Sequence, residues 1–175
     1  MLVECCKKGD RAAFTILVTR YQRPIYNAAY RVLGNAEDAS DITQVVFLRI
    51  AERLDEYDAQ YKFFSWIYRI AINESINLLR RNRREEPLDD EIELSGPASA
   101  GPERQYENGQ LSERIQRALM SMKTDDRVVL TLRHFSDCSY REIGHILDVE
   151  EKTVKSRLFE ARQRLSELLE DLRPN

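Results

Sequence analysis

The amino-acid sequence predicts an all-α protein of two small helical domains joined by a flexible linker. Three observations support this prediction. Apolar residues recur every three or four positions in almost every long segment, as on one face of a helix, and no segment has the two-residue period of a strand. The pattern stops once, from residue 85 to about 103, where prolines, glycines and acidic residues accumulate. The expected units are residues 1–86, an acidic linker at 87–103, and residues 104–175.

Three long helices are expected in the first domain, at residues 11–33, 36–54 and 63–86. Pro24 lies within the first of them and predicts a kink or a break, because proline removes a backbone N–H and its ring clashes with the preceding turn. The second opens with acidic residues, which suit a helix N-terminus, and continues with an apolar run that includes Leu48. The third turns its apolar side chains toward a core: Trp66, Ile67, Ile70, Ile76 and Leu79.

The second domain ends in a helix-turn-helix pattern. Helical segments at 108–122 and 125–135 lead into a short helix, the turn "DVE" at 148–150, and a long final helix. Ser139 and Glu142 fit the S-x-x-E capping box that opens the short helix. One apolar stripe of the final helix is expected to be buried: Val154, Leu158, Ala161, Leu165 and Leu168.

Composition limits the function classes. The chain has 175 residues, 42% hydrophobic and 33% charged, which is typical of a soluble globular protein. No run of about eighteen apolar residues occurs, so no membrane insertion is expected. The first residues lack the apolar stretch of a signal peptide, which favours a cytoplasmic location. Three cysteines and two histidines show neither disulfide nor metal-ligand spacing, so no metal and no cofactor are expected.

The net charge of -3 conceals a strong local pattern. Residues 61–86 hold six Lys or Arg against three Asp or Glu, whereas residues 87–110 hold one against six. A basic helix end followed by an acidic stretch is charge patterning rather than a uniformly acidic surface. The overall acidity therefore does not exclude nucleic acid as a partner.

The helix-turn-helix predicts binding to duplex DNA, because the second helix of this motif enters the major groove. Opposite its buried stripe the final helix presents side chains suited to phosphates, base edges and thymine methyls. These candidates are Lys152, Thr153, Lys155, Ser156, Phe159 and Glu160. Arg133, just before the motif, could clamp a phosphate. The alternative for this module alone is a plain helical hairpin with a solvated face.

The third helix and the turn before it predict binding to unpaired bases. Six rings crowd into twelve residues: Tyr57, Tyr61, Phe63, Phe64, Trp66 and Tyr68. Tyr57 and Tyr61 lie in a polar turn, where exposed rings could stack on bases, at about 1–3 kcal/mol each. Asn73 and Asn77, one turn apart, could read a base edge. Five arginines could neutralise phosphates: Arg69, Arg80, Arg81, Arg83 and Arg84. A module for duplex DNA linked to one for melted DNA is what transcription initiation requires.

Three segments, in order and correctly spaced, match a known family. They are "KGDRAAFTILVTRYQRPIYNAAYRVLGNAEDASDITQVVF", "FFSWIYRIAINESINLLRR" and "SYREIGHILDVEEKTVKSRLFEARQRL". With them the chain resembles bacterial RNA polymerase sigma factors of the extracytoplasmic-function (ECF) group over nearly its whole length.

The resemblance implies a role for each module. Asp38, Asp41, Gln44 and Phe47 would dock on the clamp helices of the largest subunit of core RNA polymerase. Tyr57 and Asn73 match positions that capture a flipped base of the minus-ten promoter element. Arg133, Lys155, Ser156, Arg157 and Phe159 match positions that meet the minus-thirty-five element. The family also implies an anti-sigma factor as a partner.

The sequence departs from the family pattern at three positions. Ser40 and Val45 replace acids that are frequent in the docking helix. Glu160 stands where some members have an arginine, and a carboxylate accepts from cytosine N4 but repels phosphate.

Two other classes of protein are alternatives to this interpretation. A stand-alone helix-turn-helix regulator would bind duplex DNA by itself, but it has no use for the acid-led helix or the ring cluster. An enzyme is not expected, because the chain offers no glycine-rich phosphate loop, metal set or nucleophile-base pair.

Overall fold

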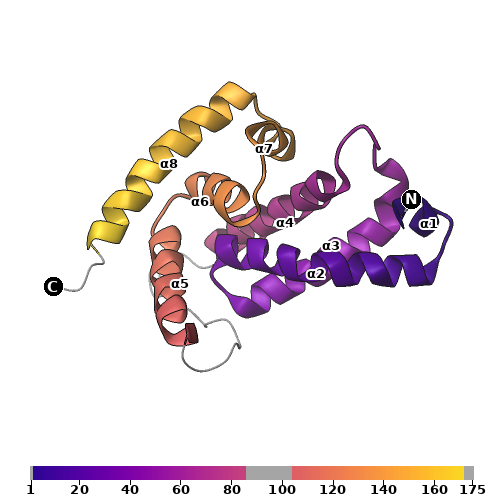
Figure 1. The fold of residues 1–175 in the computed structure, drawn as a ribbon, viewed down its shortest axis with the longest axis horizontal. Helices are drawn as coiled ribbons and strands as arrows, with labels where there is room; N and C mark the ends of the chain where they lie inside the picture. Colours follow the sequence, from indigo (N-terminus) through magenta and orange to yellow (C-terminus); the bar gives the residue numbers. More distant parts are fainter. Residues whose placement is uncertain (1, 86–103, 172–175) are drawn as a thin grey trace.

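The computed structural model describes residues 2–85 and 104–171, with the side chains of 84–111 and 171 left out of the description. Within these ranges every regular element is helical, which confirms the all-α prediction (Figure 1). The first domain contains α1 (Leu2–Lys7), α2 (Arg11–Leu33), α3 (Ala36–Arg53), the 3-10 turn η1 (Leu54–Glu56) and α4 (Phe63–Glu85). The second contains α5 (Arg104–Met120), α6 (Thr124–Leu130), the π-helical turn η2 (Thr131–Phe135), α7 (Tyr140–Leu147) and α8 (Glu151–Asp171). The expected linker at 87–103 lies outside the described residues.

The first domain is a bundle in which α2, α3 and α4 pack on one another around a shared core. Side-chain caps set where two of its helices begin. Asp10 accepts the N–H groups of the first turn of α2, and Asn35 does the same for α3. Gly34 ends α2 with φ 77°, a left-handed conformation that suits glycine. Capping side chains and a glycine therefore set the start of α2, the end of α2 and the start of α3, where the sequence predicts them.

Pro24 does not break α2, which continues as one helix from Arg11 to Leu33. The expectation of a break is wrong for a packing reason. Leu17 and Ile25, on either side of the proline, are both fully buried in the same core. Their burial outweighs the one backbone hydrogen bond that proline cannot donate.

Leu48 is exposed, although it belongs to the apolar run of α3 that the sequence predicts to be buried. Its relative exposure is 64%, whereas Val46 and Ile50 are fully buried. At 100° per residue, Leu48 lies on the opposite side of the helix from these two neighbours. An exposed leucine on an otherwise amphipathic helix marks a surface rather than a core position.

The second domain has the predicted helix-turn-helix, formed by α7 and α8. Ser139 and Glu142 make the capping box in both directions, as expected. Asp148 ends α7 in the left-handed conformation, and the chain re-enters a helix at Glu151. A Cβ on Gly144 would meet the Val149 carbonyl oxygen at 2.8 Å, so the turn can close this tightly because residue 144 has no side chain. The predicted helix at 125–135 exists as α6 continued by η2.

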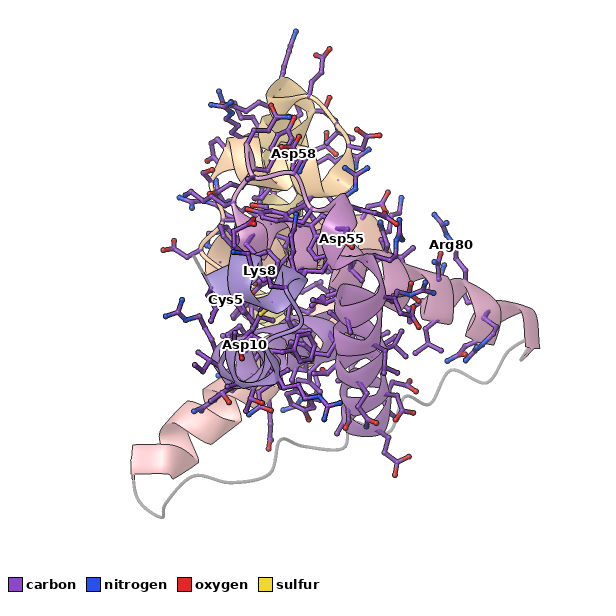
Figure 2. The ribbon with its side chains drawn as sticks, turned by 90° about the vertical axis from the view of Figure 1, so that its right-hand side faces the viewer. Cys5, Lys8, Asp10, Asp55, Asp58 and Arg80 are labelled. Atoms are coloured by element: carbon purple, nitrogen blue, oxygen red, sulfur yellow. The ribbon has the colours of Figure 1, made fainter. Side chains whose placement is uncertain are left out.

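The two domains pack directly against each other, α4 on α7 and α2 on α5, α6 and η2. Arg31 of α2 is central to this contact. Its guanidinium donates to Gln116 Oε1 and Ser112 Oγ, at 3.2 Å each, and lies 4.4 Å from the centre of the Phe135 ring. Gln116 is buried and donates in turn to the Tyr30 carbonyl. Arg80 projects from α4 well apart from Asp55 of η1 and from Asp58 in the loop that follows η1 (Figure 2).

Candidate nucleic-acid interface

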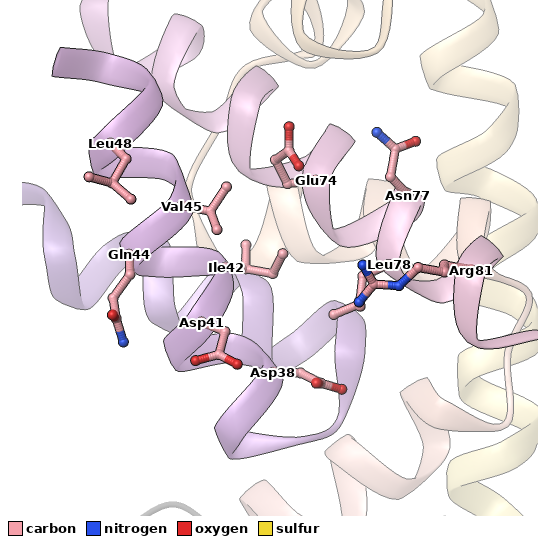
Figure 3. Close-up of a pocket in the computed structure, with 10 residues that line it drawn as sticks. All are labelled: Asp38, Asp41, Ile42, Gln44, Val45, Leu48, Glu74, Asn77, Leu78 and Arg81. Atoms are coloured by element: carbon pink, nitrogen blue, oxygen red, sulfur yellow. The ribbon is translucent and has the colours of Figure 1, made fainter. Parts of the chain in front are cut away.

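A groove of about 550 Å³ runs between α3 and α4, and most of the expected docking residues line it. Asp38, Asp41 and Gln44 follow one side of α3, and Arg81 reaches over from α4 (Figure 3). Burial, then the neighbouring charges of Asp41 and Glu37, raise the pKa of Asp38, while Arg81 acts in the opposite direction. The groove is therefore an acidic surface with one cation at its edge.

Two details of this groove differ from the expectation. Phe47 does not line it: the ring lies on another flank of α3 and packs, partly buried, against the core. Leu48 does line it, beside Gln44, and presents an exposed apolar side chain. Sequence reasoning missed Leu48 because it lies in an apolar run that was read as core. Its position off the Val46–Ile50 stripe is the signal that could have revealed it.

A second cavity, of about 230 Å³, joins α3 to the aromatic half of α4. Its lining from α4 includes Trp66, Arg69 and Asn73, and its lining from α3 includes Arg49 and Arg53. A ring, an amide and several guanidinium groups around one small space suit a planar base with its phosphate.

Arg49 and Arg53 were missed because nothing in the sequence shows that α3 faces this part of α4. Arg49 forms a 2.7 Å ion pair with Glu74 of α4, although its Nε–H does not point along a hydrogen bond. Arg53 forms an exposed ion pair with Glu56 at 2.5 Å. Both guanidinium groups are thus held at the cavity by carboxylates.

Tyr57 is half-buried rather than freely exposed. Its ring centre lies 5.0 Å from that of Phe63, which it meets edge-on, and 5.7 Å from that of Trp66. Its hydroxyl donates to the Tyr61 carbonyl at 2.6 Å. Burial is the main cause of the raised pKa of Tyr57. Among the described residues, Tyr57 is not part of the lining of the cavity that holds Asn73. Tyr57 thus supports the cavity through Trp66. Phe64 packs edge-on against Tyr68 at 5.8 Å.

The amides and arginines of α4 spread over more than one face. Asn73 lines the Trp66 cavity, Arg81 lines the groove with α3, and Arg80 lines a third cavity, of about 330 Å³, between the two domains. Asn77 borders the last two. Arg83 is exposed. The side chain of Arg84 lies outside the described residues.

The second domain covers part of this surface. The Tyr61 ring stacks on the His145 imidazole of α7, Lys62 pairs with Glu142 at 2.7 Å, and Arg69 donates to the His145 carbonyl at 3.5 Å. Arg157 lines the interdomain cavity together with Asn73 and Arg80, so it faces the first domain. The residues expected to meet unpaired DNA are therefore partly in contact with the helix-turn-helix.

The outer face of α8 carries the remaining duplex-binding candidates. Lys152, Lys155, Ser156 and Phe159 are exposed, Phe159 to 63%, and Thr153 is half-exposed. Lys155 pairs with Glu151 at 2.9 Å. Glu160 pairs with Arg164 at 3.3 Å. Arg164 also pairs with Asp126 of α6.

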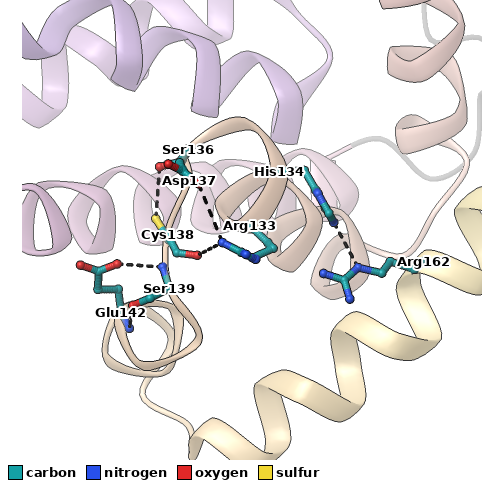
Figure 4. A network of polar contacts seen from close by, with 8 residues as sticks. All are labelled: Arg133, His134, Ser136, Asp137, Cys138, Ser139, Glu142 and Arg162. Atoms are coloured by element: carbon teal, nitrogen blue, oxygen red, sulfur yellow. Dashed lines mark hydrogen bonds and ion pairs between the residues drawn. The ribbon is translucent and has the colours of Figure 1, made fainter.

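Arg133 is held at the edge of this face. It donates to the Cys138 carbonyl at 3.1 Å and lies 3.9 Å from Asp137 (Figure 4). Arg162 of α8 donates from Nε to His134 Nε2 at 3.2 Å. Arg162 and the adjacent Tyr140 were not among the sequence-predicted residues, since their convergence with Arg133 depends on how α7 meets α8.

Neither a metal site nor a membrane span is present in the described ranges. No group of three or more His, Cys, Asp or Glu side chains there is arranged to hold a metal ion. No helix in the same ranges has both the length and the apolar character needed to cross a membrane.

Two family models match this chain, one in each helical domain. The family model of Sigma-70 region 2 matches residues 17–85, and that of Sigma-70, region 4 matches residues 112–165. The ECF RNA polymerase sigma factor SigW of Bacillus subtilis (strain 168) is 35% identical over 175 residues, which cover 95% of this chain and 94% of SigW. The ECF RNA polymerase sigma-E factor of Escherichia coli (strain K12) is 34% identical over 181 positions, which cover 98% of this chain and 94% of the sigma-E factor.

Solved structures show the same fold. CnrH, in complex with the cytosolic domain of CnrY, matches with a TM-score of 0.76 and 25% identity over 98% of this chain and 97% of CnrH. RpoE of Bartonella quintana, in complex with the anti-sigma factor NepR, matches with a TM-score of 0.75 and 23% identity. The match covers 91% of this chain and 98% of RpoE.

Two helical modules, with a helix-turn-helix in the second and a ring-and-amide cavity in the first, define a sigma-70 type transcription protein. The chain belongs to the ECF RNA polymerase sigma factors of that family.

Proposed function

We propose that this chain docks on core RNA polymerase through the α3–α4 groove and directs it to promoters with two DNA-reading surfaces. Residues 1–86 would dock on the polymerase and read and melt the minus-ten element, and residues 104–175 would read the minus-thirty-five element. The observation that carries this proposal is the coexistence of three separate surfaces: the acidic groove, the Trp66–Asn73 cavity and the exposed face of α8. A stand-alone regulator needs the last of these alone.

The residues of the groove suit a clamp-helix partner. Asp38, Asp41 and Gln44 offer carboxylates and an amide, and Leu48 adds an exposed apolar side chain between polar neighbours. Such a mixture, an apolar anchor with a charged rim, is typical of protein–protein interfaces. Docking would therefore be steered by charge and held by the leucine.

The cavity at Trp66 suits a base that has left the duplex. Removing a base from the stack costs a few kcal/mol, which a pocket offsets by stacking and edge hydrogen bonds. Asn73 would read the base, Arg49, Arg53 and Arg69 would hold the adjacent phosphates, and Tyr57 would support the wall. The chain would thus stabilise melted promoter DNA by binding, with no catalytic chemistry of its own and in the cytoplasm, where the chromosome is.

An anti-sigma factor is proposed as a second protein partner. CnrH and the Bartonella RpoE were each solved with such a protein or with a named cytosolic domain bound. CnrH matches this chain over both domains at once. The arrangement in which α4 lies on α7 is therefore compatible with a bound regulator.

The test is transcription in vitro with purified core polymerase and fragmented genomic DNA, with transcript starts mapped in the presence and absence of this protein. New starts that share two spaced upstream motifs are expected. No new starts, together with tight binding of the protein alone to duplex DNA, would favour the stand-alone regulator instead.

A further inference from the structure

Three cations of the second domain converge on a single aromatic ring, that of Tyr140 at the start of α7. The Arg133 guanidinium, from η2, lies 5.4 Å from the ring centre, and the Lys155 amine, from α8, lies 5.9 Å from it. The Arg162 side chain, two turns beyond Lys155 along α8, neighbours the phenol oxygen and lowers the pKa of that hydroxyl. Two separate elements of the DNA-facing side thus meet at one residue.

Each of these cations has a second anchor. Arg133 is fixed by the Cys138 carbonyl, Lys155 by Glu151 at 2.9 Å, and Arg162 by Nε2 of His134. A side chain held at two points keeps one direction, whereas a surface lysine or arginine held at one point samples many rotamers. The three charges are therefore ordered before any DNA arrives.

Three positive charges around one spot repel one another, and the carboxylates of Glu151 and Asp137 offset part of this repulsion. The ring opposes this repulsion, because the face of an aromatic ring carries partial negative charge and attracts cations. The phenol oxygen acts in the same direction as an acceptor. The neighbouring Arg162 and Arg133 lower the pKa of the Tyr140 hydroxyl, as expected for an oxygen surrounded by donors.

Arg162 also continues the exposed face of α8. Lys155, Phe159 and Arg162 follow one another at spacings of four and three residues, so they share one side of the helix. Lys155 and Phe159 are residues already assigned to the upstream element. Arg162, the third member of this stripe, is exposed and is oriented by its hydrogen bond to His134. It lies where a duplex bound along this face would continue.

We propose that Tyr140 is a positioning residue for recognition of the upstream promoter element, and that it adds Arg162 to the cations that grip the DNA backbone there. This inference rests on the proposed function of the α8 face. Ordering the cations in advance removes part of the entropy cost of binding, so the ring would raise affinity through its neighbours. The positions of Arg133 and Lys155 would depend on the aromatic ring of Tyr140, and the position of Arg162 would depend on its hydroxyl.

The test measures promoter affinity of the holoenzyme, formed from core polymerase and the full chain, on a duplex with its upstream element intact and on one truncated so that this element and the DNA upstream of it are absent. The variants are Tyr140→Leu, Tyr140→Phe, Lys155→Ala, Arg162→Ala and the double variants Tyr140→Leu/Lys155→Ala and Tyr140→Phe/Arg162→Ala. Arg141→Ala, which removes the adjacent exposed cation of α7, is the matched control. Helicity and melting temperature are recorded for each variant, to identify any that fail to fold.

Tyr140→Leu and Lys155→Ala are each expected to weaken binding about tenfold, whereas the double variant falls well short of a hundredfold, because the lysine has already lost its position. Tyr140→Phe keeps the ring and is expected to lose about threefold, a loss that vanishes when Arg162 is also alanine. All losses should be absent on the truncated duplex, which lacks the backbone that these cations would contact.

Additive losses for Tyr140→Leu and Lys155→Ala would overturn the positioning role, as would equal losses on both duplexes. If Lys155→Ala alone leaves the affinity unchanged, the assignment of the α8 face is wrong, and the proposal fails with it. If Lys155→Ala weakens binding but Tyr140→Leu does not, the face stands and the positioning role alone is refuted.

Discussion

The ring of Tyr61 lies flat against the imidazole of His145, with ring centres 3.9 Å apart and planes inclined by 8°. The two residues belong to different domains, Tyr61 to the loop before α4 and His145 to α7. Beside the stack, Lys62 and Glu142 form a 2.7 Å ion pair. The loop that the sequence marks as a stacking platform for bases therefore already has an aromatic partner within the chain.

Removing both loop contacts is expected to loosen the domain pair. A stacked ring pair and a partly exposed ion pair contribute roughly 1 kcal/mol each, so Tyr61→Ala/Lys62→Ala should shift the balance toward separated domains by at least about tenfold. Small-angle scattering of the free protein should then give a larger radius of gyration. Glu52→Ala/Asp55→Ala, which alters two exposed acids nearby, is the control. Identical scattering curves for both double variants would contradict this expectation.

Stability is expected to decline as the pH falls below about 6.5. Burial first, and then Arg69, lower the pKa of His145 from its ordinary value of 6.5, while Asp148 and Asp58 act in the opposite direction. Burial, Arg162 and Arg133 likewise lower the pKa of His134. The unfolded chain thus binds protons at a higher pH than the folded one, so the stabilisation is complete above that pH and is lost below it.

Thermal unfolding followed between about pH 7.5 and 5.5 checks this dependence, since unperturbed carboxyl groups titrate at lower pH. The melting temperature should decline across this window in the unaltered protein. His134→Ala/His145→Ala should flatten the curve, although it lowers the plateau. A slope that is unchanged in the double variant would assign the effect to other groups.

Asn73→Ala is expected to reduce promoter opening by about tenfold or more, since a base-edge contact of this kind is worth roughly 1–3 kcal/mol. Asn73 is exposed and lines the Trp66 cavity, so the change should spare both folding and polymerase binding. Permanganate reactivity of unpaired thymines in the holoenzyme complex is the measurement. Asn77→Ala, which changes another exposed amide one turn away that does not line the Trp66 cavity, should have a smaller effect. Loss of polymerase binding in Asn73→Ala would refute the DNA role.

Leu48→Asp is expected to weaken binding to core polymerase while leaving the free energy of unfolding within about 0.5 kcal/mol, because the side chain is exposed. A carboxylate placed among Asp38, Asp41 and Gln44 keeps the groove acidic but removes its apolar anchor. Competition with a labelled sigma factor for core polymerase gives the affinity. The comparison variant is Ile16→Asp, at an exposed apolar residue on α2. Equal affinities for both variants would remove Leu48 from the docking surface.

Much of this fold could be predicted because each helix buries one face, and a buried face leaves a period of three to four residues in the sequence. The helix-turn-helix was predictable for an additional local reason, since the Ser139–Glu142 capping box and the turn at 148–150 lie within a few residues of each other. The break that Pro24 could have caused does not occur, because the core contacts that keep α2 whole come from other helices.

The sites were less predictable, because each combines residues that are distant in the sequence. Arg49 reaches the Trp66 cavity from α3, and Arg162 meets Tyr140 across the helix-turn-helix. Tyr57 lies in a polar turn, yet its ring is covered by Phe63, six residues later. Periodicity shows which face of a helix is buried, but it does not show which other helix covers that face.

The contact between α4 and α7 has one consequence for distance. Asn73 and Arg157 line the same cavity of about 330 Å³, whereas promoter elements named for positions ten and thirty-five lie about 25 base pairs apart, or about 85 Å at 3.4 Å per pair. A protein that reads both elements at once cannot keep these two residues together. Under the proposed function, the arrangement described here is therefore that of the protein away from its promoter, and reading both elements requires Asn73 and Arg157 to move several times further apart.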